Sequence, residues 1–158
     1  MKKLVAYFSA TGVTAGVASN LADAIGSDLL EICPAERYNK EDLNWWEAES
    51  RSTLEMKDPG CRPEITAPEQ KISDYDVIFI GFPIWWNTAP RIVNTFLEAY
   101  DFAGKILVPF ATSGGSSADG VLDSLKGSCP GAHLHPAKLL DPKLSFRELS
   151  DFAEASLS

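Results

Sequence analysis

The sequence predicts an α/β protein built on a parallel sheet. Four apolar segments, residues 4–8, 29–33, 76–82 and 105–111, alternate with stretches whose apolar residues recur at helical spacing. This alternation, with mostly short connections, is typical of parallel strands joined by helical crossovers. Residues 76–82 are apolar almost throughout, which indicates a strand covered by helices on both faces.

The individual strands differ in how strongly the residues favour them. The segment 29–33 is interrupted by Glu31, which suits an edge position. The segment 105–111 contains Pro109, which lacks a ladder N–H group and prefers an edge or a bulge. Residues 137–140 form a weaker candidate for a fifth strand.

Helices are predicted over residues 13–25, 90–99, 117–125 and 145–155, from apolar residues spaced along one side. Pro90 suits the first turn of its helix, where a missing N–H group costs nothing. Residues 34–75, the excursion, form an unusually long connection with one further predicted helix at 41–57. Connections of this length are often functional lids. We expect residues 1–158 to form a single domain that carries this excursion.

The charge limits the partners that the protein can have. A formal net charge of −8 argues against nucleic acid and against an anionic membrane, because both need a basic face. The acidity either aids solubility or steers the protein towards a basic redox partner. Because no apolar run approaches the ~20 residues of a membrane span and no signal peptide precedes the first strand, we expect a cytoplasmic protein.

The cysteines and histidines do not form a recognisable reactive or metal-binding pattern. Three cysteines without paired spacing and two histidines indicate reduced thiols and no metal site. Cys33 has no histidine near it in the sequence, and no arginine-bearing loop follows Cys129. We therefore assign no catalytic residue.

Three loops with unusual composition follow the first, third and fourth predicted strands. In an open parallel sheet, ligands bind beyond the carboxyl ends of the strands. The candidate ligand-binding residues are Ser9, Ala10, Thr11, Gly12, Val13 and Thr14 in the first loop, Pro83, Ile84, Trp85, Trp86 and Asn87 in the second, and Thr112, Ser113, Gly114, Gly115 and Ser116 in the third.

The chemistry of these loops matches the parts of a flavin mononucleotide. The first loop is uncharged and precedes a helix, so its N–H groups and the helix dipole favour a phosphate. The two indoles of the second loop offer a stacking surface for a flat ring. Gly114 and Gly115 allow backbone to approach a pyrimidine-like edge. Each loop alone has an ordinary structural explanation, as a helix cap, a core pair or a turn, and only their combination indicates FMN.

Other nucleotide motifs do not fit. The first loop lacks the Gly-Lys-Ser/Thr of a P-loop, and it lacks the three spaced glycines of a dinucleotide fingerprint.

The same residues resemble those of the flavodoxin-like family whose second loop carries a Trp-Trp pair. Residues 8–14 resemble its phosphate loop, 81–90 its second loop and 110–115 its third, and residues 42–45 with Ser50-Arg51 resemble its excursion. The resemblance covers about residues 2–155. It implies a three-layer, doubly wound, five-stranded parallel sheet with strand order 2-1-3-4-5, and one non-covalently bound FMN.

Two residues depart from the family pattern. Val13 stands where the phosphate loop usually has Asn, and Asn87 stands where the second loop usually has Gly. Many flavodoxins flip a peptide beside the flavin, which glycine makes easy, although Asn tolerates positive φ better than most residues. We therefore expect a costlier flip and a poorly stabilised one-electron-reduced flavin.

Two functions compete at this point. The first, favoured by the acidity, is flavodoxin-type electron transfer in the cytoplasm to a redox partner protein that is basic. The second is NAD(P)H-dependent reduction of quinones or similar small acceptors, which the excursion favours if it walls a substrate pocket. A third possibility is that the protein has the fold of the family but has lost its cofactor. We expect a monomer or weak homodimer, with Trp45 and Trp46 in the core or an interface.

Overall fold

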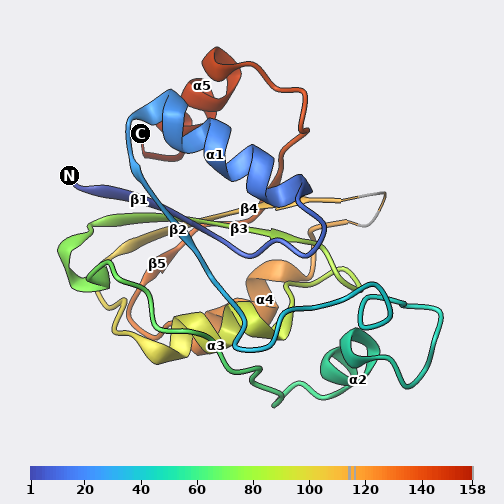
Figure 1. The fold of residues 1–158 in the computed structure, drawn as a ribbon. Coiled ribbons are helices and arrows are strands. Elements are labelled where there is room, and N and C mark those ends of the chain that lie inside the picture. The colour runs from blue at the N-terminus through green and yellow to red at the C-terminus, as the bar shows by residue number, and fades with distance from the viewer. Residues whose placement is uncertain (114, 116, 158) are drawn as a thin grey trace.

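The computed structural model describes residues 1–113, 115 and 117–157 and places its strands in one parallel sheet (Figure 1). The strands are β1 (Lys3–Tyr7), β2 (Asp28–Glu31), β3 (Val77–Pro83), β4 (Ile106–Thr112), β5 (His133–Leu134) and β6 (Lys138–Leu139). Their order is β2-β1-β3-β4-β5, with β6 also paired to β4. The predicted strand order is confirmed, and β2 with Glu31 lies at the edge.

Helices cover both faces of the sheet, which gives the three predicted layers (Figure 1). One face carries α1 (Val13–Ile25) and α5 (Phe146–Leu157), and the other carries α3 (Arg91–Ala99) and α4 (Val121–Leu125). The short helix α2 (Arg51–Lys57) lies farther out, within the excursion, near the edge where β1 and β3 end. Two 3₁₀ turns, η1 (Ile72–Asp74) and η2 (Lys126–Ser128), complete the described elements.

The central strand β3 is apolar throughout because helices cover both of its faces. Val77 and Phe79 belong to the core beneath α1 and α5, whereas Ile78, Ile80 and Phe82 belong to the core beneath α3 and α4. All five side chains are fully buried. Because successive side chains of a strand point to opposite faces, both faces must be apolar when both are covered.

Pro109 lies in the interior strand β4 and is accommodated by a break in its neighbour. The carbonyls of Lys105, Leu107 and Ala111 accept hydrogen bonds from residues 133, 135 and 140, which lie in or directly after β5 and β6. By alternation, residue 109 faces the same side. Strand β5 pairs with residues 106–107 and β6 with residues 110–111, leaving a gap opposite Pro109. The proline needs no N–H partner there. The predicted fifth strand at 137–140 is present as the short strand β6, and β5 precedes it outside the predicted range.

The prediction of a helix over residues 41–57 is wrong for its first ten residues. Asn39 and Asp42 exchange side-chain to backbone hydrogen bonds, and the Asn44 side chain accepts from the N–H of Trp46. Such local bonds compete with helical ones. The helix begins only at Arg51, after Ser50 caps it by accepting from the N–H of Thr53.

Smaller differences concern helix ends. Pro90 is the N-cap of α3 rather than a residue of its first turn, and α4 covers only residues 121–125 of the predicted 117–125. No helix within the described residues is long and apolar enough to cross a membrane.

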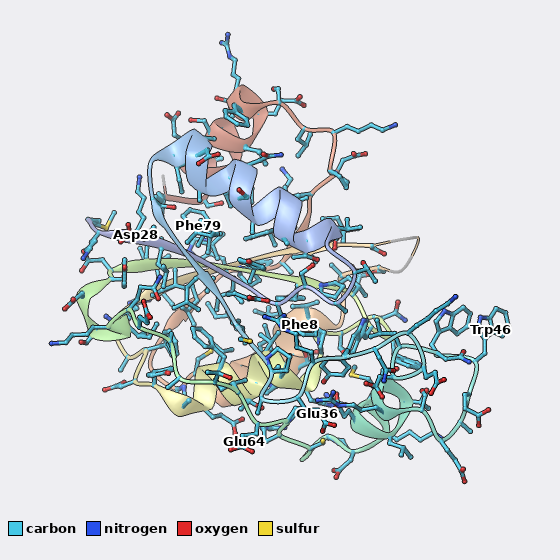
Figure 2. The ribbon with its side chains drawn as sticks, viewed as in Figure 1. Phe8, Asp28, Glu36, Trp46, Glu64 and Phe79 are labelled. Carbon is cyan, nitrogen blue, oxygen red and sulfur yellow. The ribbon has the colours of Figure 1, made fainter. Side chains whose placement is uncertain are left out.

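Two stretches of the excursion pair with each other just beyond the end of β2. Pro34 and Ile65 form an antiparallel bridge, flanked by hydrogen bonds from Ala35 N–H to the Glu64 carbonyl and from Thr66 N–H to the Cys33 carbonyl. Figure 2 shows Glu36 and Glu64 on neighbouring stretches of this segment. The segment is therefore anchored next to the edge strand.

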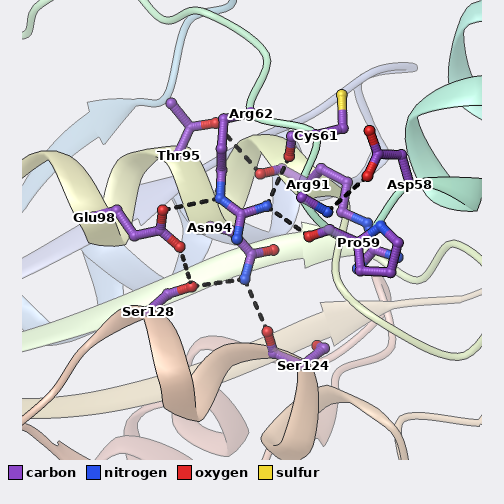
Figure 3. A network of polar contacts seen from close by, with 11 residues as sticks. Asp58, Pro59, Cys61, Arg62, Arg91, Asn94, Thr95, Glu98, Ser124 and Ser128 are labelled. Atoms are coloured by element: carbon purple, nitrogen blue, oxygen red, sulfur yellow. Dashed lines mark hydrogen bonds and ion pairs between the residues drawn. The ribbon is translucent and has the colours of Figure 1, made fainter.

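A second attachment joins the excursion to α3 (Figure 3). The Arg62 Nε donates to Glu98 at 2.9 Å, while the same guanidinium donates to the carbonyls of Pro59 and Cys61. Ser128 donates to the other oxygen of Glu98 at 2.6 Å, and the Asn94 amide donates to Ser128. We call Arg62, Glu98, Ser128 and Asn94 the α3 tether.

Candidate ligand-binding site

The loop between β1 and α1 presents unoccupied backbone donors. Gly12 is the N-cap of α1 with φ of 96°, a conformation that glycine adopts readily, and no side chain caps this helix. The Gly12 N–H donates to Ser9 Oγ at 3.0 Å, which braces the loop. The first-turn N–H groups lack intrahelical partners and lie at the positive end of the dipole. This end of α1 therefore suits an anion.

Thr14 and Thr112 join the first loop to the third. Their hydroxyls lie 2.7 Å apart, and the two residues are almost wholly buried. The Thr14 hydroxyl pairs with Thr112, and the Thr14 backbone N–H lies in the first turn of α1, where N–H groups lack intrahelical partners. Val13, in contrast, is half-exposed and offers only its N–H.

The second loop contains a tight two-residue hairpin. The N–H groups of Trp85 and Thr88 each donate to the other residue's carbonyl at 3.0 Å. The central residues have positive φ, 50° for Trp86 and 63° for Asn87, as in a type I′ turn. This conformation is readily accepted by Asn and strained for a bulky residue such as Trp86.

The start of α4 packs closely against this turn. A Cβ atom at Gly120 would lie only 2.6 Å from the Asn87 carbonyl oxygen. Glycine is required there because the backbone approaches so closely. The turn is therefore held from outside as well as by its own hydrogen bonds.

Trp85 is positioned by an aromatic cluster that reaches into the excursion. The rings of Phe8, Tyr38 and Trp85 meet edge to face, with centroids 5.5–5.7 Å apart. Figure 2 labels Phe8 beneath the sheet, where β1 ends. Edge-to-face contacts of this kind are favourable beyond simple burial. They connect the excursion directly to the second loop.

Arg51 and Glu55 hold Tyr38 of this cluster in place. The Arg51 guanidinium stands 3.7 Å from the centre of the Tyr38 ring and pairs with Glu55 at 3.1 Å. The Tyr38 hydroxyl donates to the same carboxylate. Burial and this hydrogen bond raise the pKa of Tyr38 well above its ordinary value. Arg51 therefore packs the excursion.

A cavity of about 490 Å³ opens among these elements. The ten described residues that line it are uncharged: Ala10, Thr11, Leu43, Trp45, Ser52, Pro83, Ile84, Trp85, Trp86 and Asn87. Seven of these were predicted from the first and second loops. Leu43, Trp45 and Ser52 come from the excursion and were not predicted as site residues.

The described residues of the third loop lie beside this cavity rather than in its lining. Thr112 is buried, and its carbonyl accepts from the N–H of Ile84 at 2.9 Å, which joins the second and third loops. The Gly115 N–H donates to Ser113 Oγ. Thr112, Ser113 and Gly115 do not line the cavity. The predicted residues Gly114 and Ser116 lie outside the described part of the chain.

The pair Trp45–Trp46 is not in the core. The two rings stack 4.2 Å apart at the surface, and they are 59% and 80% exposed. Only Trp45 also lines the cavity. No feature of the sequence distinguishes an exposed stacked pair from a buried one. Ser52 had no signal at all, because an isolated serine in a helical stretch is ordinary.

Comparisons with known proteins agree with this arrangement. The sequence model of the family described as Flavodoxin matches residues 2–156. The chain belongs to the flavodoxin family. No curated protein matches the chain.

Among solved structures, the chain is similar to a protein from Bacteroides eggerthii assigned as a flavoprotein, with 45% identity and a TM-score of 0.92 over 99% of this chain and 98% of that one. A Bacteroides uniformis protein with the same assignment gives 45% identity and 0.90, with 97% of each chain covered. A Lactobacillus acidophilus flavoprotein in complex with FMN is 22% identical, with a TM-score of 0.71 over 87% of this chain and 92% of that one, and it shares the fold.

Proposed function

We propose that this protein binds one FMN and works as a flavodoxin-type electron carrier in the cytoplasm. The observation that carries the proposal is the uncapped, uncharged N-terminus of α1 beside an uncharged aromatic cavity, in a member of the flavodoxin family. The FMN complex of the Lactobacillus acidophilus relative supports the choice of cofactor.

The residues present fit this cofactor. The free N–H groups at the start of α1 suit its phosphate, and neutral donors hold an anion here despite the net charge of −8. Trp85 and Trp86 offer apolar ring surface. When bound, FMN supplies the redox chemistry, while the protein orients it and sets its surroundings.

The cofactor assignment is tested by titrating the protein freed of ligand with FMN and with riboflavin, which lacks the phosphate. We expect FMN to bind much more tightly than riboflavin. Thr11→Asp places a negative charge in the first loop. It should weaken the binding of FMN by at least ten-fold and change the binding of riboflavin little. Ser150→Asp, on α5 beside the C-terminal end of α1, is the matched control. Equal affinity for both flavins, or an unaffected Thr11→Asp variant, would contradict the phosphate assignment.

The acidic surface beside the site supports a basic protein as the electron acceptor. Glu41, Asp42, Glu47 and Glu49 surround one hollow next to the exposed tryptophans, with Arg51 as its cation. Opposite charges across an interface accelerate encounter and lose effect as salt screens them.

The carrier function is tested by electron transfer from the reduced, FMN-loaded protein to cytochrome c, a basic probe. We expect the rate to fall as ionic strength rises. The double variant Glu47→Gln with Glu49→Gln should be slower at low salt, whereas Asp151→Asn with Glu154→Gln on α5 should be nearly unchanged. Rates independent of salt and of both pairs would exclude this acidic surface as the docking side.

A second candidate function is NAD(P)H-dependent reduction of quinones or similar small acceptors. The observation that favours it is the contribution of Leu43, Trp45 and Ser52 to the cavity wall, since a carrier needs no such wall. Stopped-flow mixing of the FMN-loaded protein with NADPH separates the two functions. Rapid bleaching of the flavin absorbance by NADPH alone would establish the reductase, and no bleaching would exclude it.

A further inference from the structure

The indole of Trp85 lines the cavity, but its own loop does not fix the direction of the ring. The N–H and the carbonyl of Trp85 exchange hydrogen bonds with Thr88, and these bonds hold the backbone of the hairpin. Backbone bonds do not select among the staggered rotamers of a side chain. The orientation of this indole therefore depends on the side chains packed against it.

Two aromatic rings meet the indole of Trp85 edge to face. The Phe8 ring lies 5.7 Å from it at an interplanar angle of 89°, and the Tyr38 ring lies 5.6 Å from it at 75°. Phe8 follows β1 and is buried in the core, so its ring is fixed by the sheet. Tyr38 belongs to the excursion and is only partly buried. One of the two supports of Trp85 therefore comes from outside the sheet.

Tyr38 is held in turn by two charged side chains of α2. The Arg51 guanidinium lies 3.7 Å from the centre of the Tyr38 ring. Its Nε donates to Glu55 at 3.1 Å, and its Nη1 donates to the Glu36 carbonyl at 2.8 Å. The Tyr38 hydroxyl donates to the other oxygen of Glu55. The ring is thus fixed at its face by a cation and at its hydroxyl by a carboxylate.

The burial of this charged pair indicates a role in orientation. Glu55 is only 8% exposed, and its partner Arg51 is largely covered as well. A buried ion pair contributes little net stability, because the removal of both charges from water offsets their attraction. What the pair does provide is a fixed place for the ring that lies against Arg51.

We propose that Tyr38 is a positioning residue for the cofactor: its ring, held by Arg51 and Glu55, keeps the indole of Trp85 in the orientation in which it lines the cavity. Tyr38 itself is not among the described residues of the lining, so it acts through Trp85. Its effect on the flavin rests on the proposed function, whereas the orientation of Trp85 requires no ligand. Because a wall that is already ordered loses less entropy on binding, loss of the Tyr38 ring should weaken FMN binding.

The first test compares Tyr38→Leu with Tyr100→Leu in FMN titrations of the protein freed of ligand. Tyr100 is the matched control, because its partly buried ring also packs against two phenylalanines but follows the end of α3 farthest from the second loop. We expect Tyr38→Leu to weaken FMN binding by about five-fold, the equivalent of roughly one aromatic contact. Tyr100→Leu should bind like the wild type. Tyr38→Phe keeps the ring and should stay within about two-fold of the wild type.

The second test measures the indole directly and needs no flavin. Nitrogen relaxation gives the order parameter of the Trp85 indole N–H group, whose signal is assigned with Trp85→Phe. We expect Tyr38→Leu to lower this order parameter, while Tyr38→Phe and Tyr100→Leu leave it unchanged. Tyr38→Met, with a long flexible side chain and no ring, replaces the leucine variant if that variant does not fold.

Three results would exclude the positioning role: unchanged FMN affinity in Tyr38→Leu, an equal loss of affinity in Tyr100→Leu, or an unchanged order parameter of the indole. A Tyr38→Phe variant as weak as Tyr38→Leu would overturn the assignment to the ring. Absence of FMN binding by the wild type is a failure of the proposed function instead. The order parameter then still decides whether Tyr38 orients Trp85.

Discussion

At the scale of single residues, the second loop concentrates its conformational strain in two adjacent positions. Trp86 and Asn87 both have positive φ, although neither is glycine. For most residues this backbone region costs about 1–2 kcal/mol, and Asn is among those that tolerate it best. Asn87 therefore suits the positive φ of the turn, whereas Trp86 adopts a positive φ that its bulky side chain disfavours.

Substitutions at Asn87 test this account. Asn87→Ala should lower the free energy of unfolding by about 1 kcal/mol, because alanine is disfavoured at φ of 63°. Asn87→Gly should stay within about 0.5 kcal/mol of the wild type, since glycine accepts the conformation but gains entropy in the unfolded chain. Urea denaturation measures both. Equal destabilisation by Ala and Gly would show that the Asn87 side chain, and not its φ, matters.

The buried pair Thr14–Thr112 gives a second prediction at this scale. Thr14→Val leaves the Thr112 hydroxyl buried without its partner, and we expect a loss of about 1–3 kcal/mol of unfolding free energy. The double variant with Thr112→Val removes both hydroxyls and should recover most of that loss. A double-mutant cycle by urea denaturation measures the coupling. Additive losses would mean that the two hydroxyls act independently.

At the scale of elements, the α3 tether determines how firmly the excursion is held. Glu98 accepts from Arg62 and from Ser128 on η2, so one carboxylate connects three segments (Figure 3). The hydrogen bond from Arg62 holds the pKa of Glu98 below its ordinary value. A lowered folded-state pKa stabilises the fold above the ordinary carboxylate range. That contribution is lost as pH falls through the lowered pKa.

Removal of the tether should loosen the excursion locally. Arg62→Ala loses the contact with Glu98 and the bonds to two excursion carbonyls, so amide exchange over residues 58–62 should accelerate while that of β3 stays slow. Lys126→Ala breaks only an exposed ion pair with Asp123 and is the control. The Arg62→Ala difference should shrink in acid as Glu98 becomes protonated. Unchanged exchange at neutral pH would show that the end pairing at Pro34 and Ile65 suffices.

The elements also show where sequence reasoning succeeds. Strands β1, β3 and β4 are predicted to within one residue at each end, because burial leaves a clear apolar run, as in β3. The end of β2 is missed by two residues, and the two-residue strand β5 was not predicted. Residues 41–50 were mispredicted because their helical propensity is overridden by the side chains of Asn39, Asp42 and Asn44.

Some residues of the candidate site could likewise be predicted from the sequence, and others could not. Loops that follow strands directly were predictable, because topology brings the carboxyl ends of parallel strands to one edge. Leu43, Trp45 and Ser52 reach the cavity through the tertiary path of the excursion. No periodicity encodes that path, so these residues became visible only in the folded molecule.

At the scale of the whole molecule, the four tyrosines share one electrostatic behaviour. Burial raises the pKa of Tyr7, Tyr38 and Tyr100, and burial with a hydrogen bond to Asp28 raises the pKa of Tyr75 to about 12. The fold therefore favours the neutral phenols. Because the folded-state pKa values are raised, this contribution is complete below pH 10 and is lost as pH rises from there towards 12.

The free energy of unfolding should therefore fall steeply above pH 10. Urea denaturation between pH 8 and 11 measures this slope, and Tyr75→Phe should make it shallower because one such group is removed. Tyrosine absorbance near 295 nm provides the control, since the phenols of the folded protein should ionise later than those in urea. A flat profile, or ionisation near pH 10 in the folded state, would contradict the role of the tyrosines.

The four tryptophans of the chain are Trp45, Trp46, Trp85 and Trp86, and all belong to the excursion or the second loop. Tryptophan fluorescence therefore reports on the excursion and the second loop, and not on the layer formed by α1 and α5. If the excursion detaches before the sheet melts, the fluorescence transition will precede the loss of far-UV circular dichroism. The difference between the denaturation midpoints of fluorescence and of circular dichroism then measures how cooperatively the excursion and the rest of the protein unfold.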